Sequence, residues 1–107
     1  MQLSQTSIKL KAATLNRIVA DYPFVVEVAK KNIQKISKAI SGDVLHKYLL
    51  TWENALSDQS KLMALVADNT AYGFDMWQIN PFTGIFSPKE RWDILRGEVC
   101  LKTNWNT

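Results

Sequence analysis

Apolar residues recur every three or four positions along most of this chain, which is the spacing of one face of an α-helix. The first such stretch predicts a helix from about Ser4 or Thr6 to Ala20, ended by Asp21-Tyr22-Pro23. Its predicted buried stripe consists of Ile8, Ala12, Leu15 and Val19.

The longest apolar pattern predicts a second helix from about Pro23 to Ile40. A strand over residues 24–28 is an alternative because β-branched residues are frequent there, but the length and the 3.6-residue period favour a helix. Lys31, Lys35 and Lys38 fall on the side of this helix opposite its apolar arc. The arc consists of Val25, Val28, Ala29, Ile33, Ile36, Ala39 and Ile40.

Asn32 is the one amide within that apolar arc. A buried amide that lacks hydrogen-bond partners costs about 1–3 kcal/mol, so Asn32 must find them. We expect it to bind a backbone group, or to fix the register of the helix.

Turn residues divide the remainder of the chain into shorter helices. Ser41-Gly42-Asp43 ends the second helix, with Gly42 in a left-handed conformation and Asp43 as the predicted N-cap of a third helix that ends near Leu56. A fourth helix follows Ser57 or Asp58, and a fifth covers Ala71 to about Gln78. The predicted buried face of the third helix consists of Val44, Leu45, Tyr48, Leu49, Trp52, Ala55 and Leu56.

The last helix has the clearest start signal in the chain. Ser87 is the predicted N-cap, Pro88 occupies the first helical position, and Glu90 completes a capping box. This helix is predicted to run to about Glu98 and to bury Trp92, Leu95 and Val99. The sequence therefore predicts one all-α domain over residues 1–107. We expect a bundle of about five to six helices, in which two or three long N-terminal helices pack against short C-terminal ones.

Before that helix, Asn80-Pro81 and Thr83-Gly84 predict a turn. The turn carries three large apolar residues, Phe82, Ile85 and Phe86. Such a loop must either fill a groove in its own fold or contact a partner.

The 107 residues have a net charge of +3, and the charge is unevenly distributed. Residues 1–50 contain seven Lys and one Arg against three acids, whereas residues 51–107 contain three Lys and two Arg against seven acids. This polarity is compatible with nucleic acid, with an acidic protein partner or with head-to-tail self-association. A single cysteine, no secretion signal and no membrane-spanning run predict a cytoplasmic protein.

Catalytic chemistry finds little support in the residue pattern. The glycines stand far apart, so no phosphate-binding loop is formed, and one His46 with one Cys100 has no metal-ligand spacing. Glu90 and Asp93 are explained as acids at a helix N-terminus. We expect no enzyme activity, no cofactor and no metal.

A regulator that binds DNA or RNA is the alternative function. Lys31, Lys35 and Lys38 form a basic stripe suited to phosphates. However, Arg17 is the one arginine in that half, and no aromatic residue alternates with these lysines as a stacking platform.

Binding to another protein is the preferred prediction, because the last third of the chain holds more aromatic residues than a few short helices are expected to cover. Trp105 either folds back as a lid or anchors another chain. The lysine stripe would then attract an acidic partner. The predicted contact residues are Trp77, Phe82, Ile85, Phe86 and Trp105.

Three segments carry a resemblance to a known group. They are Ala29-Lys-Lys-Asn-Ile33, the run Leu49-Leu50-Thr51-Trp52 with Ala55-Leu56, and Asn80-Pro-Phe-Thr-Gly-Ile-Phe-Ser-Pro-Lys-Glu-Arg-Trp-Asp-Ile-Leu95. Together they resemble small bacterial helical proteins in which a Pro-Phe-x-Gly segment follows a tryptophan-bearing helix, some of them antitoxin-like partners in toxin–antitoxin modules. The resemblance implies a small bacterial protein that binds and neutralises another protein, such as a toxin or an enzyme.

Overall fold

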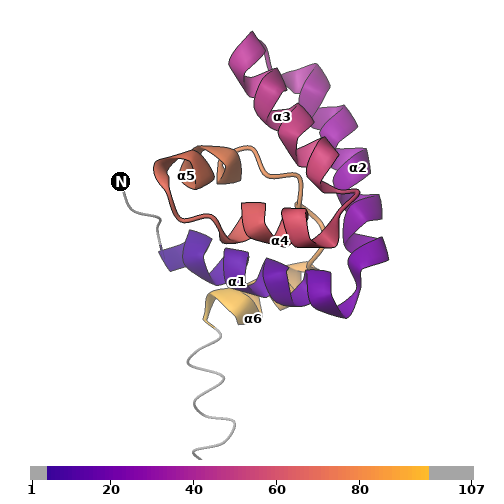
Figure 1. The fold of residues 1–107 in the computed structure, drawn as a ribbon. Coiled ribbons are helices and arrows are strands. Elements are labelled where there is room, and N and C mark those ends of the chain that lie inside the picture. The colour runs from indigo at the N-terminus through magenta and orange to yellow at the C-terminus, as the bar shows by residue number, and fades with distance from the viewer. Residues whose placement is uncertain (1–4, 97–107) are drawn as a thin grey trace, which may run out of the picture.

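The computed structural model describes residues 5–96 and is all-α, with no strand in that part of the chain (Figure 1). Three longer helices come first: α1 (Gln5–Ala20), α2 (Tyr22–Ala39) and α3 (Asp43–Ala55). Three shorter ones follow: α4 (Gln59–Ala67), α5 (Ala71–Trp77) and α6 (Pro88–Leu95). The predicted all-α bundle and its order of long and short helices are confirmed.

The helices begin where side chains cap them. Asp21, Asp58, Thr70 and Ser87 each accept a hydrogen bond from a backbone N–H in the first turn of the following helix. At Ser87 both halves of the predicted capping box are formed. Gly42 has a φ of +96°, as the left-handed prediction requires, but it is itself the N-cap of α3 and Asp43 is the first helical residue.

Helix α1 lies at the centre of the arrangement, where it contacts α2, α4 and α6 (Figure 1). Helices α2 and α3 pair with each other and extend beyond the remaining helices (Figure 1). Because the far end of this pair has fewer neighbours, part of its apolar surface stays uncovered.

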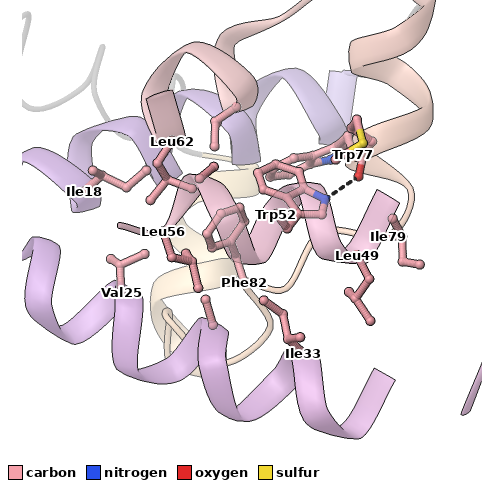
Figure 2. Packing of buried hydrophobic residues seen from close by; sticks show 14 of the residues in the cluster. Ile18, Val25, Ile33, Leu49, Trp52, Leu56, Leu62, Trp77, Ile79 and Phe82 are labelled. Atoms are coloured by element: carbon pink, nitrogen blue, oxygen red, sulfur yellow. Dashed lines mark hydrogen bonds between the residues drawn. The ribbon is translucent and has the colours of Figure 1, made fainter. Parts of the chain in front are cut away.

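One apolar core joins the helices, and Trp52 lies within it with no exposed surface (Figure 2). Its indole Nε1 donates a hydrogen bond to the carbonyl of Met76 at 3.0 Å, so the polar atom of this buried ring is satisfied. The core consists of Ile18, Val25, Ala29, Ile33, Leu49, Trp52, Ala55, Leu56, Leu62, Val66, Met76, Trp77, Ile79, Phe82 and Ile85.

The predicted stripe of α1 is wrong, because Ile8 and Val19 are 47% and 65% exposed. The buried face consists of Lys11, Thr14 and Ile18, and it is rotated about the helix axis by about 100° from the predicted face.

Two polar residues can lie on this face because their polar atoms have partners. Lys11 Nζ donates to the Asp68 carbonyl at 2.8 Å and lies 5.8 Å from the centre of the Trp77 ring. Burial lowers the pKa of Lys11. The negative charge of Asp68 acts in the opposite direction, but its effect is smaller. The Thr14 hydroxyl donates to the Leu10 carbonyl at 2.7 Å.

Helix α6 also differs from its prediction. Trp92 is 61% exposed and Leu95 is half-buried, because this short helix covers the outer side of α1 and has no fully buried residue. Val99 and the predicted end at Glu98 lie outside the described residues.

Gly73 in α5 allows a close approach of two backbone segments. A Cβ atom at this position would lie 2.0 Å from the carbonyl oxygen of Asp68.

Gly73→Ala should therefore destabilise the protein by about 2 kcal/mol, because the added methyl group forces the turn between α4 and α5 to move. Chemical denaturation measures this change. Helix propensity alone predicts a gain of about 0.5–1 kcal/mol, so a more stable variant would contradict the observed packing.

Candidate functional site

The loop between α5 and α6, residues 78–87, is called here the aromatic loop. Asn80 starts its turn: Oδ1 accepts from the N–H of Phe82 at 3.0 Å, and Nδ2 donates to the carbonyl of Trp77 at 2.8 Å. Gly84 has a φ of +96°, a conformation that favours glycine. The turn predicted from Asn80-Pro81 and Thr83-Gly84 is therefore formed by the expected residues.

Asn32 of α2 holds this turn in place. Its Nδ2 donates to the carbonyl of Pro81 at 2.9 Å and to that of Thr83 at 2.6 Å. The expectation that Asn32 binds a backbone group is confirmed. Its partners lie in the aromatic loop, 49 and 51 residues further along the chain.

Phe82 of the aromatic loop points into the core of the protein, toward Trp52 (Figure 2). Phe82 is 5% exposed and meets the Trp52 ring edge-on, with centroids 5.2 Å apart. Phe82 also stacks on the ring of Trp77, which is 7% exposed. Ile85 of the same loop is 2% exposed. Of the two alternatives for this loop, the structure shows the first: it fills a groove in its own fold.

This burial changes the predicted contact surface. Trp77, Phe82 and Ile85 contribute to the core and do not present an apolar centre to a partner. Phe86 is half-buried, with the Arg17 guanidinium 5.0 Å from its ring centre. Trp105 lies outside the described residues.

Arg17 of α1 contacts both the aromatic loop and the first turn of α6. Its guanidinium donates to the carbonyl of Ile85 at 3.1 Å and to Glu90 Oε2 at 2.9 Å. The other carboxylate oxygen of Glu90 accepts the N–H of Ser87 at 2.8 Å. These hydrogen bonds, that of Ser87 first and that of Arg17 second, lower the pKa of Glu90.

The predicted basic stripe is present. Lys31, Lys35 and Lys38 are exposed on the face of α2 opposite its buried residues, and none of them forms an ion pair within residues 5–96. We call this surface the lysine face.

Apolar side chains are exposed on α3 and α5, and two of them, Val44 and Leu45, correct the predicted buried face of the third helix. Val44 is 61% exposed, Leu45 39% and Tyr72 44%. Tyr48, half-buried, meets the ring of Tyr72 edge-on with centroids 6.1 Å apart, and Val44 and Leu45 lie one turn away from it on α3. These four residues form the tyrosine patch. Val44, Leu45 and Tyr48 continue the buried face of α3 beyond the point where other helices pack against it. The local sequence does not indicate where that packing ends.

Reactive side chains are few in the described part of the chain. Within residues 5–96, no group of three or more His, Cys, Asp and Glu is placed to hold a metal ion. The ring nitrogens of exposed His46 lie 2.9 Å from the Gly42 carbonyl and 3.2 Å from that of Ser37, and these contacts raise its pKa. Cys100 lies outside the described residues.

Comparison with protein-family models, with curated proteins and with solved structures finds no match for this chain. Among the described helices, none has the length and apolar character needed to cross a membrane.

One prediction from this region concerns the contact between Asn32 and the aromatic loop. Asn32→Asp replaces the donor that serves two carbonyl oxygens with a carboxylate that repels them. The variant should lose about 2 kcal/mol of unfolding free energy. Gln34→Glu makes the same chemical change at an exposed position of α2 and should stay within about 0.5 kcal/mol of the unsubstituted protein. Equal effects of the two substitutions in chemical denaturation would show that the Asn32 contact is not needed.

Another prediction follows from the lowered pKa of Glu90. The folded state favours the charged form, so the stability from Glu90 is present above its unfolded pKa of about 4.5 and is lost as pH falls through the lower folded pKa. Glu90→Gln should therefore reduce the loss of stability between about pH 6 and pH 3. Denaturation midpoints across this range measure it. Glu53→Gln, at an exposed carboxylate with no ion pair within residues 5–96, is the control and should leave the loss unchanged.

Proposed function

We propose that this protein is a protein–protein interaction module, an antitoxin-like or other inhibitory binder that neutralises a partner protein in the bacterial cytoplasm. The observation that carries this proposal is the tyrosine patch. Two aromatic rings and two aliphatic side chains share one surface, where water covers much of their area. Surfaces of this kind are typical of sites where another protein binds.

The tyrosine patch has the properties of an interface centre. Its two rings already contact each other edge-on, so little side-chain freedom is lost when a partner covers them. Val44 and Leu45 lie on a helix that is anchored by buried Leu49 and Trp52. A partner would therefore meet a fixed apolar surface.

The lysine face supports the proposal in a different way. It lies on α2, on the side opposite the buried residues of that helix, whereas the tyrosine patch lies on α3 and α5. Its three positive charges would attract an acidic partner over a distance, which affects the rate of association more than the affinity.

Nucleic-acid binding is the alternative function, and the lysine face is the observation that favours it. Three exposed ammonium groups on one helix face, without ion pairs in the described chain, are suited to a phosphate backbone. A mobility shift at low and at moderate salt separates the two functions, because binding through phosphates falls steeply as salt rises.

The prediction that tests protein binding uses substitutions on the surface of α3 and α5. Val44→Asp and Tyr72→Asp place a charge in the tyrosine patch, whereas Leu50→Asp makes the same change at a 54% exposed position on another side of α3. Purification from the native host with the unsubstituted protein identifies the partner. Each patch variant should then bind it at least about thirtyfold more weakly, as expected for the loss of about 2 kcal/mol at a hot spot.

Leu50→Asp should retain the partner, and all three variants should keep the helical circular dichroism of the unsubstituted protein. Equal affinity of patch and control variants would contradict the assignment of the tyrosine patch. Self-association is tested with the same proteins by sedimentation, where loss of a dimer in the patch variants alone would identify a second copy as the partner.

A further inference from the structure

A cleft of about 330 Å³ lies between the start of α1, the aromatic loop and α6. Aromatic rings from the aromatic loop and the end of α5 form one part of its wall: Trp77, Phe82 and Phe86. Polar side chains form another: Gln78, Thr83 and Arg91. The volume lies at the lower end of the range for small-molecule sites, which combine an apolar wall with a few polar groups.

The charge of this cleft has one sign. Arg91 is the one charged residue among the described residues that line it, and no carboxylate does so. The cleft therefore favours an anion over a neutral or cationic ligand.

Arg91 differs from the other charged residues of its helix. Asp93 pairs with Lys89 at 3.3 Å and lies 3.9 Å from Arg96, and Glu90 pairs with Arg17 at 2.9 Å. Within residues 5–96, Arg91 has neither an ion pair nor a hydrogen bond from its side chain. Its guanidinium is available to a ligand in the cleft.

We propose that this cleft binds the carboxylate of a ligand with an aromatic or other apolar body. The planar guanidinium of Arg91 would hold the carboxylate through two parallel hydrogen bonds, an arrangement for which arginine is the best-matched side chain. The apolar body would lie mainly against half-buried Phe86, and would touch Trp77 and Phe82 only through the 7% and 5% of their surface that stays exposed. Gln78 and Thr83 are exposed at the cleft and supply additional donors.

Two sources share this chemistry: a free aromatic acid and the C-terminus of a polypeptide that ends in an aromatic residue. The cleft is lined by none of the residues of the tyrosine patch. Failure of one proposal therefore leaves the other unaffected.

The experiment titrates the full chain with three probes and follows its tryptophan indole N–H signals by NMR. The probes are phenylacetate, the peptide Ala-Ala-Phe with a free C-terminus, and the same peptide as its C-terminal amide. The Trp77 signal should shift with the two acids and not with the amide, while the signal of Trp52, whose Nε1 is bonded to the Met76 carbonyl, should shift much less.

Arg91→Gln should weaken binding of the acids at least about tenfold, as expected for the loss of a charge-assisted hydrogen bond. Lys89→Gln is the matched control, because it removes a positive charge from the same helix at a residue that does not line the cleft, and it should leave binding within about twofold. Tighter binding of the peptide than of phenylacetate identifies a chain terminus as the ligand, and the reverse order identifies a free acid. Equal binding of acid and amide, no shift of Trp77 with either acid, or equal effects of the two substitutions would overturn the proposal.

Discussion

The amide of Asn32 joins two parts of the chain that local structure cannot bring together. It binds two carbonyl oxygens of one turn, and these contacts fix the aromatic loop against α2. Phe82, between the two bonded residues, then reaches the ring of Trp52. A hydrogen bond between neutral groups contributes only about 1 kcal/mol, but it determines where several hundred square ångströms of aromatic surface are buried. Helix α6 follows the aromatic loop directly and has no fully buried residue of its own, so its position depends on where the loop is held.

Two kinds of apolar surface result from this arrangement. The aromatic loop is held inward, so its rings stabilise the fold and leave one cleft beside Arg91. The pair of α2 and α3 extends past the core, so Val44 and Leu45 in the first turn of α3 are 61% and 39% exposed. The proposed interaction surface thus lies on the start of α3 and on α5, and the aromatic loop has a structural role. The lysine face lies on α2, opposite the buried residues of that helix.

Local signals in the sequence predicted much of this fold. The caps at Ser87 and Asp58, the left-handed Gly42 and the turn at Asn80 act through atoms within a few residues, so the sequence contains the whole interaction. The buried face of α1 could not be predicted in this way. Lys11 can be buried because its ammonium donates to the carbonyl of Asp68, 57 residues further along the chain. Thr14 can be buried because its hydroxyl donates to the carbonyl of Leu10 in the preceding turn. Similarly, Val44, Leu45 and Tyr48 have the pattern of a buried face, and the positions of the neighbouring helices decide that this end of α3 is exposed. For the aromatic loop, the sequence leaves both a groove in its own fold and a partner open, since no sequence pattern reports the groove that receives it.

Phe82 packs inside the protein against Trp52, and nuclear Overhauser effects between the two rings measure this contact. Strong cross-peaks are expected between the Phe82 ring protons and the Trp52 indole protons, because the ring centroids are 5.2 Å apart. The Trp52 Nε1 proton, which is donated to the carbonyl of Met76, should exchange slowly with solvent. Absence of these cross-peaks, together with rapid exchange of that proton, would show that the aromatic loop lies outside the core.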